Sequence, residues 1–118
     1  MGNPELGVLE LNASSGGAMQ IKNLSPPGNA SGLVMSVNVF VEVGASVEIM
    51  LYAQTGTPLR WADGGTIIPT PGQWYCLVLD FDAPVTTSGN WDPTDVQVIG
   101  VDIQGSGDLR VYLDQFVY

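Results

Sequence analysis

The chain has 118 residues, which is enough for one domain with a single core and too few for two, so residues 1–118 are expected to form one domain. Its formal net charge is −9, and its only basic side chains are Lys22, Arg60 and Arg110. Nucleic acid and membrane surfaces, which attract clustered Lys and Arg, are therefore poor partners. Fifteen Gly and eight Pro, spread along the chain, are typical of many short strands joined by tight turns.

Eight segments are predicted to be strands and none to be a helix, because apolar and polar residues alternate within each segment and turn-forming residues bound it. In chain order they cover residues 7–12, 18–23, 33–43, 46–55, 58–62, 73–82, 96–104 and 108–117. The longest connection, residues 83–95, contains Trp91. Strands without helices predict an all-β fold, an antiparallel β-sandwich of about eight strands.

The alternation also predicts which side chains face the core. The inward set is Met35, Val37, Val39, Val41, Val47, Ile49, Leu51, Ala53, Tyr75, Leu77, Leu79, Phe81, Ile99, Val101, Ile103, Leu109, Val111 and Leu113. A one-residue bulge near Asp114 would exchange the faces of Phe116 and Tyr118, so the alternation does not assign these two residues.

The outward side chains are mostly aromatic, acidic or amide-bearing, which is unusual for a plain scaffold. They would share one sheet face if their strands are neighbours, and they are Asn38, Glu48, Met50, Tyr52, Gln54, Asp102, Gln104, Arg110 and Tyr112. Aromatic rings can stack on the C–H face of a sugar, and acid, amide and guanidinium groups can hydrogen-bond its hydroxyls. The mixture predicts a carbohydrate-binding surface better than a protein-binding one, which usually has a drier apolar centre.

Each of the three tryptophans has a structural and a ligand-binding interpretation. Trp74 begins a strand, where it can cover the edge of the sandwich or contact ligand. Trp61, just before Asp63-Gly64-Gly65, is expected to face ligand. Trp91 lies in a long polar loop, where it can bind ligand or cover one end of the core.

The sequence predicts a binding domain rather than an enzyme. Glu48 and Asp102 could in principle form a glycosidase pair, but a sandwich of this size has little material for the deep cleft that most glycosidases need. The chain has no His, and its single cysteine, Cys76, is expected to be a packing residue, which excludes Ser-His and Cys-His nucleophile systems. A structural or protein-binding sandwich of the adhesion type is the main alternative.

Carboxylates near strand ends also allow a structural calcium ion, because Ca²⁺ takes oxygen ligands. Asp114 with Glu10 is the first candidate pair, and Asp63 with Asp92 the second. Neither pair has motif spacing.

Four short motifs resemble the β-sandwich carbohydrate-binding modules of microbial plant-cell-wall hydrolases. They are Leu-x-Leu at 9–11, Pro-Gly-Gln-Trp at 71–74, Val-x-Val-Ile-Gly-Val at 96–101 and Val-Tyr-Leu-Asp at 111–114. The resemblance implies a jelly-roll sandwich, often with one structural calcium, and a concave face that binds a single glycan chain. The first expectation for that chain is β-1,4-linked glucan (cellulose, mixed-linkage glucan or xyloglucan), and mannan or xylan come next. It also implies a secreted parent protein in which the module is tethered to a glycoside hydrolase. Because the expected contacts are mostly uncharged, binding should change little between low and moderate salt.

Overall fold

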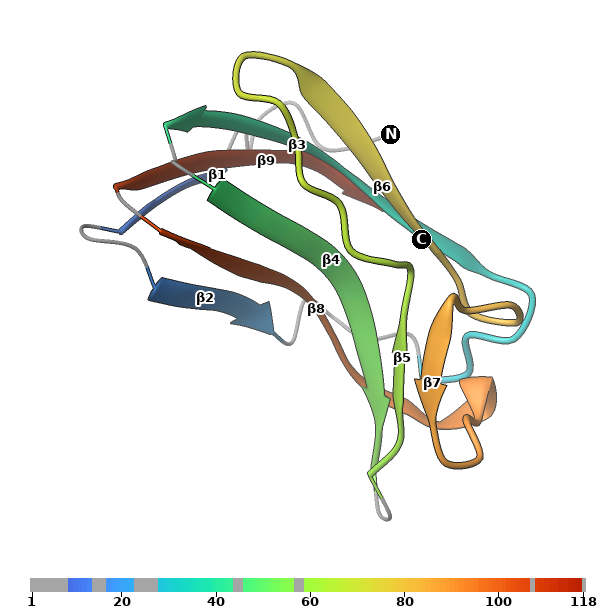
Figure 1. The fold of residues 1–118 in the computed structure, drawn as a ribbon. Helices are drawn as coiled ribbons and strands as arrows, with labels where there is room; N and C mark the ends of the chain where they lie inside the picture. Colours follow the sequence, from blue (N-terminus) through green and yellow to red (C-terminus); the bar gives the residue numbers. More distant parts are fainter. Residues whose placement is uncertain are drawn as a thin grey trace.

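The computed structural model describes residues 9–13, 17–22, 28–43, 46–56, 59–106 and 108–117. They form two antiparallel sheets packed face to face, so the predicted all-β sandwich is confirmed (Figure 1). Within this described part of the chain, no helix is long and apolar enough to cross a membrane.

The four-stranded sheet has the order β1-β9-β3-β6. Its strands are β1 (Leu9–Ala13), β9 (Leu109–Val117), β3 (Val34–Val43) and β6 (Trp74–Asp80). The five-stranded sheet has the order β2-β8-β4-β5-β7. Its strands are β2 (Gly17–Lys22), β8 (Val96–Ser106), β4 (Ser46–Thr55), β5 (Trp61–Asp63) and β7 (Thr86–Ser88).

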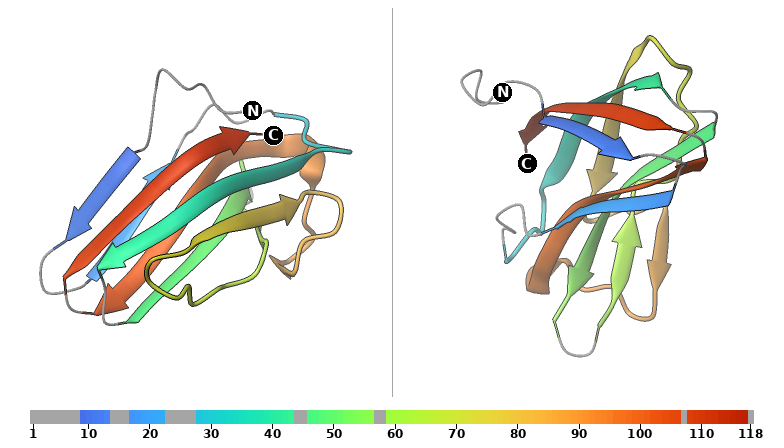
Figure 2. Two further views of the ribbon diagram at one scale, coloured as in Figure 1. Left: turned by 90° about the horizontal axis from the view of Figure 1, so that it is seen from above. Right: turned by 90° about the vertical axis from the view of Figure 1, so that its left-hand side faces the viewer.

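Strands that follow one another in sequence often belong to different sheets. β1 and β2, β3 and β4, and β8 and β9 each divide between the two layers. The ends at which these pairs succeed one another gather on the left of Figure 1, and Figure 2 shows the two layers from two further sides. Sequence neighbours are therefore poor guides to which strands share a face.

The core lies between the sheets and is built from the inward set that the alternation predicts. Met35, Val37, Ile49 and Leu79, for example, are each at most 1% exposed. Burial of these apolar side chains supplies the main stabilising free energy of the fold. Tyr75 is the exception in the predicted set, because it is only half-buried and its hydroxyl accepts a hydrogen bond from the Thr70 amide.

The strand predictions differ from the structure at two places. β5 begins at Trp61 rather than at residue 58, and β7 lies within the segment that is predicted to be a connection. β7 has three exposed residues and no apolar alternation, so it carries no core signal. A single turn of 3-10 helix, Pro93–Asp95, precedes β8, with the carboxylate of Asp92 accepting from the Thr94 amide.

A bulge is present near Asp114, at the place where its possibility left Phe116 and Tyr118 unassigned. Ser36 pairs with Val117 and Asn38 with Asp114, so two steps along β3 correspond to three along β9. The extra residue lies within 115–116, whose side chains are outside the described part of the structure.

Gly64 follows β5, at the point where the chain packs against the backbone of β6 in the other sheet, and only glycine fits there. A Cβ atom at this position would lie 2.0 Å from the carbonyl oxygen of Val78 on β6. Real Cβ atoms do not approach a backbone oxygen so closely, and backbone cannot move aside as a flexible side chain can. Gly64 therefore allows the chain that follows β5 to approach β6.

We predict that Gly64→Ala lowers the free energy of unfolding by about 3 kcal/mol, because the added methyl overpacks a rigid contact. Gly72→Ala is the control: Gly72 has a φ of 90° and open space around its Cβ position. That variant should cost only about 1 kcal/mol, the cost of a left-handed backbone. Urea unfolding of both variants measures the difference, and equal losses would contradict the close contact.

Candidate functional site

The structure divides the predicted surface residues between two opposite outer faces. Asn38, Arg110 and Tyr112 lie on β3 and β9 of the four-stranded sheet. The others lie on β4 and β8 of the five-stranded sheet, and they are Glu48, Met50, Tyr52, Gln54, Asp102 and Gln104. The condition under which all nine would share one face is therefore not met.

On the five-stranded sheet, Trp61 lies over Tyr52. The ring centroids are 4.8 Å apart and the planes differ by 7°, a parallel stack. Tyr52 is on the outer face as predicted, yet it is only 1% exposed, because the indole covers it. The indole nitrogen of Trp61 donates to Asp63 Oδ2 at 2.9 Å, and Asp63 Oδ1 accepts from the Gly65 amide. The half-exposed indole is thereby fixed in one orientation, with one ring face on Tyr52.

Two polar atoms on this face are buried without a hydrogen-bond partner. They are the Tyr52 hydroxyl and Asp102 Oδ1, and Asp102 is 7% exposed. The other carboxylate oxygen of Asp102 accepts from the Gln104 amide nitrogen at 3.4 Å. Burial, and then the nearby charge of Asp102, raise the pKa of the Tyr52 hydroxyl, which keeps it protonated. An unpartnered buried polar atom is costly, so a ligand that satisfied either one, after a rotation of its side chain toward the surface, would recover part of that cost.

A hollow of about 90 Å³ opens beside Asp102. It is lined by Glu48, Ile49, Met50, Thr66, Asp102 and Gln104. The register explains its position: Glu48 pairs with Gln104 and Met50 with Asp102, which makes one compact group across β4 and β8. In Figure 1, β4 and β8 bend along their length, with the inner side of the bend turned away from the four-stranded sheet.

Thr66 also lines the hollow, and the sequence alone did not predict it as a site residue. The chain after β5 bonds to β4 at two points, from the Gly64 amide to the Leu51 carbonyl and between Ile49 and Ile67. Thr66 lies between these points, and its hydroxyl lies 3.8 Å from the sulfur of Met50. No local pattern in the sequence indicates this, because the position of Thr66 depends on where β5 ends.

The outer face of the four-stranded sheet carries a row of three aromatic rings. Phe40 lies between Trp74 and Tyr112, with ring centroids 5.3 and 6.1 Å away and planes tilted by 45° and 54°. Glu42 accepts from the Tyr112 hydroxyl at 2.5 Å and pairs with Arg110 at 3.4 Å. Trp74 is 51% exposed, so it does not merely cover the edge of the sandwich.

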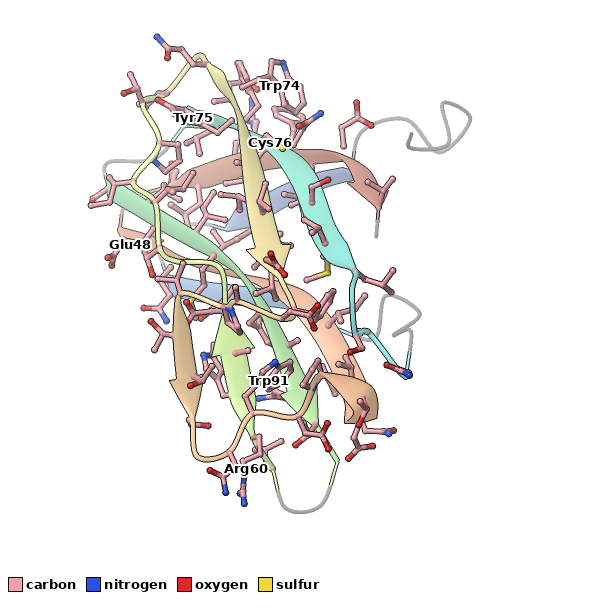
Figure 3. All side chains as sticks on the ribbon, turned by 90° about the vertical axis from the view of Figure 1, so that its right-hand side faces the viewer. Glu48, Arg60, Trp74, Tyr75, Cys76 and Trp91 are labelled. Atoms are coloured by element: carbon pink, nitrogen blue, oxygen red, sulfur yellow. The ribbon has the colours of Figure 1, made fainter. Side chains whose placement is uncertain are left out.

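Cys76 and Trp91 belong neither to the aromatic stack nor to the lining of the hollow. Cys76 is exposed on β6, so the prediction that it is a packing residue is wrong: its strand position faces outward, between Trp74 and Val78. Trp91 packs against the core and donates from its indole nitrogen to the Phe81 carbonyl at 2.9 Å, which favours its role as a cover for one end. Figure 3 shows Trp74 in the upper part of the molecule and Trp91 in the lower part, so these two indoles do not converge.

The carboxylates considered for calcium lie in different surroundings. Asp63 is bonded to Trp61 and Gly65, and Asp92 accepts from Thr94, which lowers the pKa of the Asp92 carboxyl. Glu10 pairs with Tyr112 in the β1–β9 register, two positions from Asp114, but the side chain of Glu10 is outside the described residues. In the part of the chain that the structure describes, no three Asp, Glu, Cys or His residues group as metal ligands. Calcium at Glu10 and Asp114 stays a prediction.

Comparison with known proteins gives a fold likeness. No protein-family model matches the chain, and no curated protein matches it. One similar solved structure comes from work on "the promiscuous specificity of the carbohydrate-binding modules from the beta-sandwich super family", with a TM-score of 0.61 and 18% identity. The match covers 94% of this chain but 46% of the other, so this chain spans about half of that protein's length. The likeness shows that the two share a β-sandwich fold.

We predict that Tyr52→Phe raises the free energy of unfolding by about 1 kcal/mol, because it removes an unpartnered buried hydroxyl and keeps the ring under Trp61. Tyr75→Phe is the matched control. The Tyr75 hydroxyl has a partner in the Thr70 amide, so its loss should lower stability or leave it unchanged. Urea unfolding at neutral pH measures both, and a destabilised Tyr52→Phe would show that the hydroxyl is satisfied.

The same hydroxyl should give stability a pH dependence at high pH. The pKa of the Tyr52 hydroxyl in the folded protein lies above the ordinary value of 10.0. The part of the stability that depends on a protonated hydroxyl is therefore complete below pH 10 and is lost as the pH rises through the folded pKa. Above pH 10 the unfolded chain releases this proton first. We expect the melting temperature of the wild type to fall more steeply there than that of Tyr52→Phe, and parallel curves would contradict the raised pKa.

Proposed function

We propose that the protein is a non-catalytic carbohydrate-binding domain whose ligand lies along the outer face of the five-stranded sheet. The observation that carries the proposal is the placement of two unpartnered buried polar atoms, on Tyr52 and Asp102, beside the fixed indole of Trp61. Sugar hydroxyls both donate and accept hydrogen bonds, so they match a carboxylate oxygen and a phenol. The likeness to a carbohydrate-binding module in fold adds support.

The ligand class that we propose first is a chain of β-1,4-linked glucan, such as cellulose, mixed-linkage glucan or xyloglucan. Such a chain has flat C–H faces that can stack on the exposed part of the Trp61 indole. Its equatorial hydroxyls would lie near Gln54, Glu48 and Gln104, which are on the same outer face. A few contacts of this kind sum to micromolar to sub-millimolar affinity, or about 4–8 kcal/mol.

Binding without catalysis fits the shape of the site. Glu48 and Asp102 lie in one hollow, but about 90 Å³ cannot enclose a sugar between two carboxylates. One oxygen of Asp102 is also engaged by Gln104. The residues can hold a ligand from one side only.

In the parent protein, the domain would act by proximity. We propose that it is secreted as part of a larger protein and holds a tethered glycoside hydrolase at its polymer. Tethering raises the local concentration of the enzyme without any new catalytic contact.

One observation favours the alternative of a protein-binding sandwich. The row of Trp74, Phe40 and Tyr112 places exposed aromatic surface on the other outer face. Large aromatic side chains are enriched at protein interfaces.

Titration with a soluble β-1,4-glucan oligosaccharide tests the proposal. We predict a change in tryptophan fluorescence, and a loss of at least tenfold in affinity for Trp61→Ala, which removes about 1.4 kcal/mol or more of stacking. Trp74→Ala, on the opposite face, is the matched control and should bind like the wild type. Circular dichroism confirms that each variant folds.

Two results would contradict the proposal. If Trp74→Ala loses binding and Trp61→Ala keeps it, the ligand lies on the four-stranded sheet. If no β-1,4-glucan binds, the protein-binding alternative is favoured. Affinity for a neutral oligosaccharide should also change little with salt.

A further inference from the structure

The hollow beside Asp102 carries two carboxylates and no basic group among its described lining residues. Glu48 is exposed at its rim and Asp102 is buried at its base. In the register they are diagonal neighbours across β4 and β8. Two acids in one small hollow are more stable when a cation lies between them.

Asp102, which lines the hollow, has one buried acceptor without a hydrogen-bond partner. The amide nitrogen of Gln104 donates to Asp102 Oδ2, and Asp102 Oδ1, buried and without a partner, remains. A carboxylate oxygen only accepts hydrogen bonds, so the missing partner must be a donor. A charged donor makes a bond about twice as strong as a neutral one.

The other residues that line the hollow favour an ammonium group over a metal ion as the bound cation. Ca²⁺ needs six to eight oxygen ligands. Here one carboxylate oxygen is occupied by Gln104, and the thioether of Met50 fills part of the hollow. An ammonium has three N–H donors and an apolar carbon frame, which suit two carboxylates and a thioether wall.

We propose that the hollow binds the protonated amine of an amino sugar, so that the preferred ligand is a β-1,4-linked chain carrying 2-amino groups in place of 2-hydroxyls. This inference rests on the proposed function, because the sugar ring reaches the hollow from the same outer face that carries Trp61. The amine donates to Asp102 Oδ1 and to Glu48. The acidic chain as a whole, at −9, favours the approach of such a polymer.

Calorimetric titration compares three oligosaccharides of equal length: β-1,4-linked glucose, β-1,4-linked glucosamine and its N-acetylated form. At a pH where the amine is protonated, we expect the glucosamine chain to bind about tenfold tighter than the other two. That preference should fall with salt and disappear at a pH where the amine is neutral.

Asp102→Asn and Glu48→Gln test the residues. In each variant the affinity for the glucosamine chain should fall to the affinity that the same variant shows for the glucose chain, so that the preference is abolished. Glu48 is exposed, so its variant should fold normally even if Asp102→Asn does not. Asp80→Asn is the matched control: it removes one charge on the other outer face and keeps the oxygen that accepts from the Asp82 amide. It should retain the full preference.

Each other outcome overturns the inference in a distinguishable way. Equal loss in Asp80→Asn would mean that net charge alone attracts the amine. Binding of glucose chains without any preference for amines would leave the proposed function standing and refute the amine site. Tighter binding of a trilysine peptide, with the same dependence on Asp102, would assign the hollow to a basic peptide. Failure of all three oligosaccharides to bind would refute the proposed function itself.

Discussion

The antiparallel pairing of β4 with β8 is the interaction on which both the core and the candidate site depend. One side of this ladder supplies Ile49, Leu51, Val101 and Ile103, all buried between the sheets. The other side brings the residues of the hollow together. A shift of register by one residue would exchange the two sets, so the register that builds the core also fixes the site.

Two buried polar groups on the outer face of this sheet lower the stability of the fold. A phenol and a carboxylate oxygen are buried there without partners, next to an indole that an aspartate holds in place. Apolar residues at positions 52 and 102 would fold at lower cost. Such a conflict between local stability and composition is typical of a surface shaped for a ligand.

Much of the fold could be predicted from the sequence, because alternation with a period of two is a local signal. It identified the strands other than β7 and the inward residues other than Tyr75, including Met35, Leu79 and Val111. It could not identify the order of strands within each sheet, which depends on crossings between layers. For that reason the alternation gave the correct outward face for Tyr112 and Tyr52 but could not show that these faces point in opposite directions.

The same limit applies to individual side chains on the outer faces. Alternation places Tyr52 outside the core, yet only the pairing of β4 with β5 reveals that Trp61 covers it. β5 contributes this cover, and the chain after it bonds to β4 again at Ile67, which places Thr66 beside the hollow. The site is thus a consequence of a short strand, a feature with too few residues to give a periodic signal.

The two outer faces differ in what their aromatic rings can do. Phe40, Trp74 and Tyr112 are tilted against one another at 5.3 and 6.1 Å, so part of each ring packs on its neighbour, and Tyr112 is further held by Glu42. Trp61 instead lies parallel to Tyr52, and its bond to Asp63 holds the flat, partly exposed indole in one orientation. A planar ring held in advance loses little entropy on binding a flat sugar face, whereas a tilted cluster would first have to rearrange. The five-stranded sheet therefore fits the proposed carbohydrate ligand better, although the four-stranded sheet has the more exposed tryptophan.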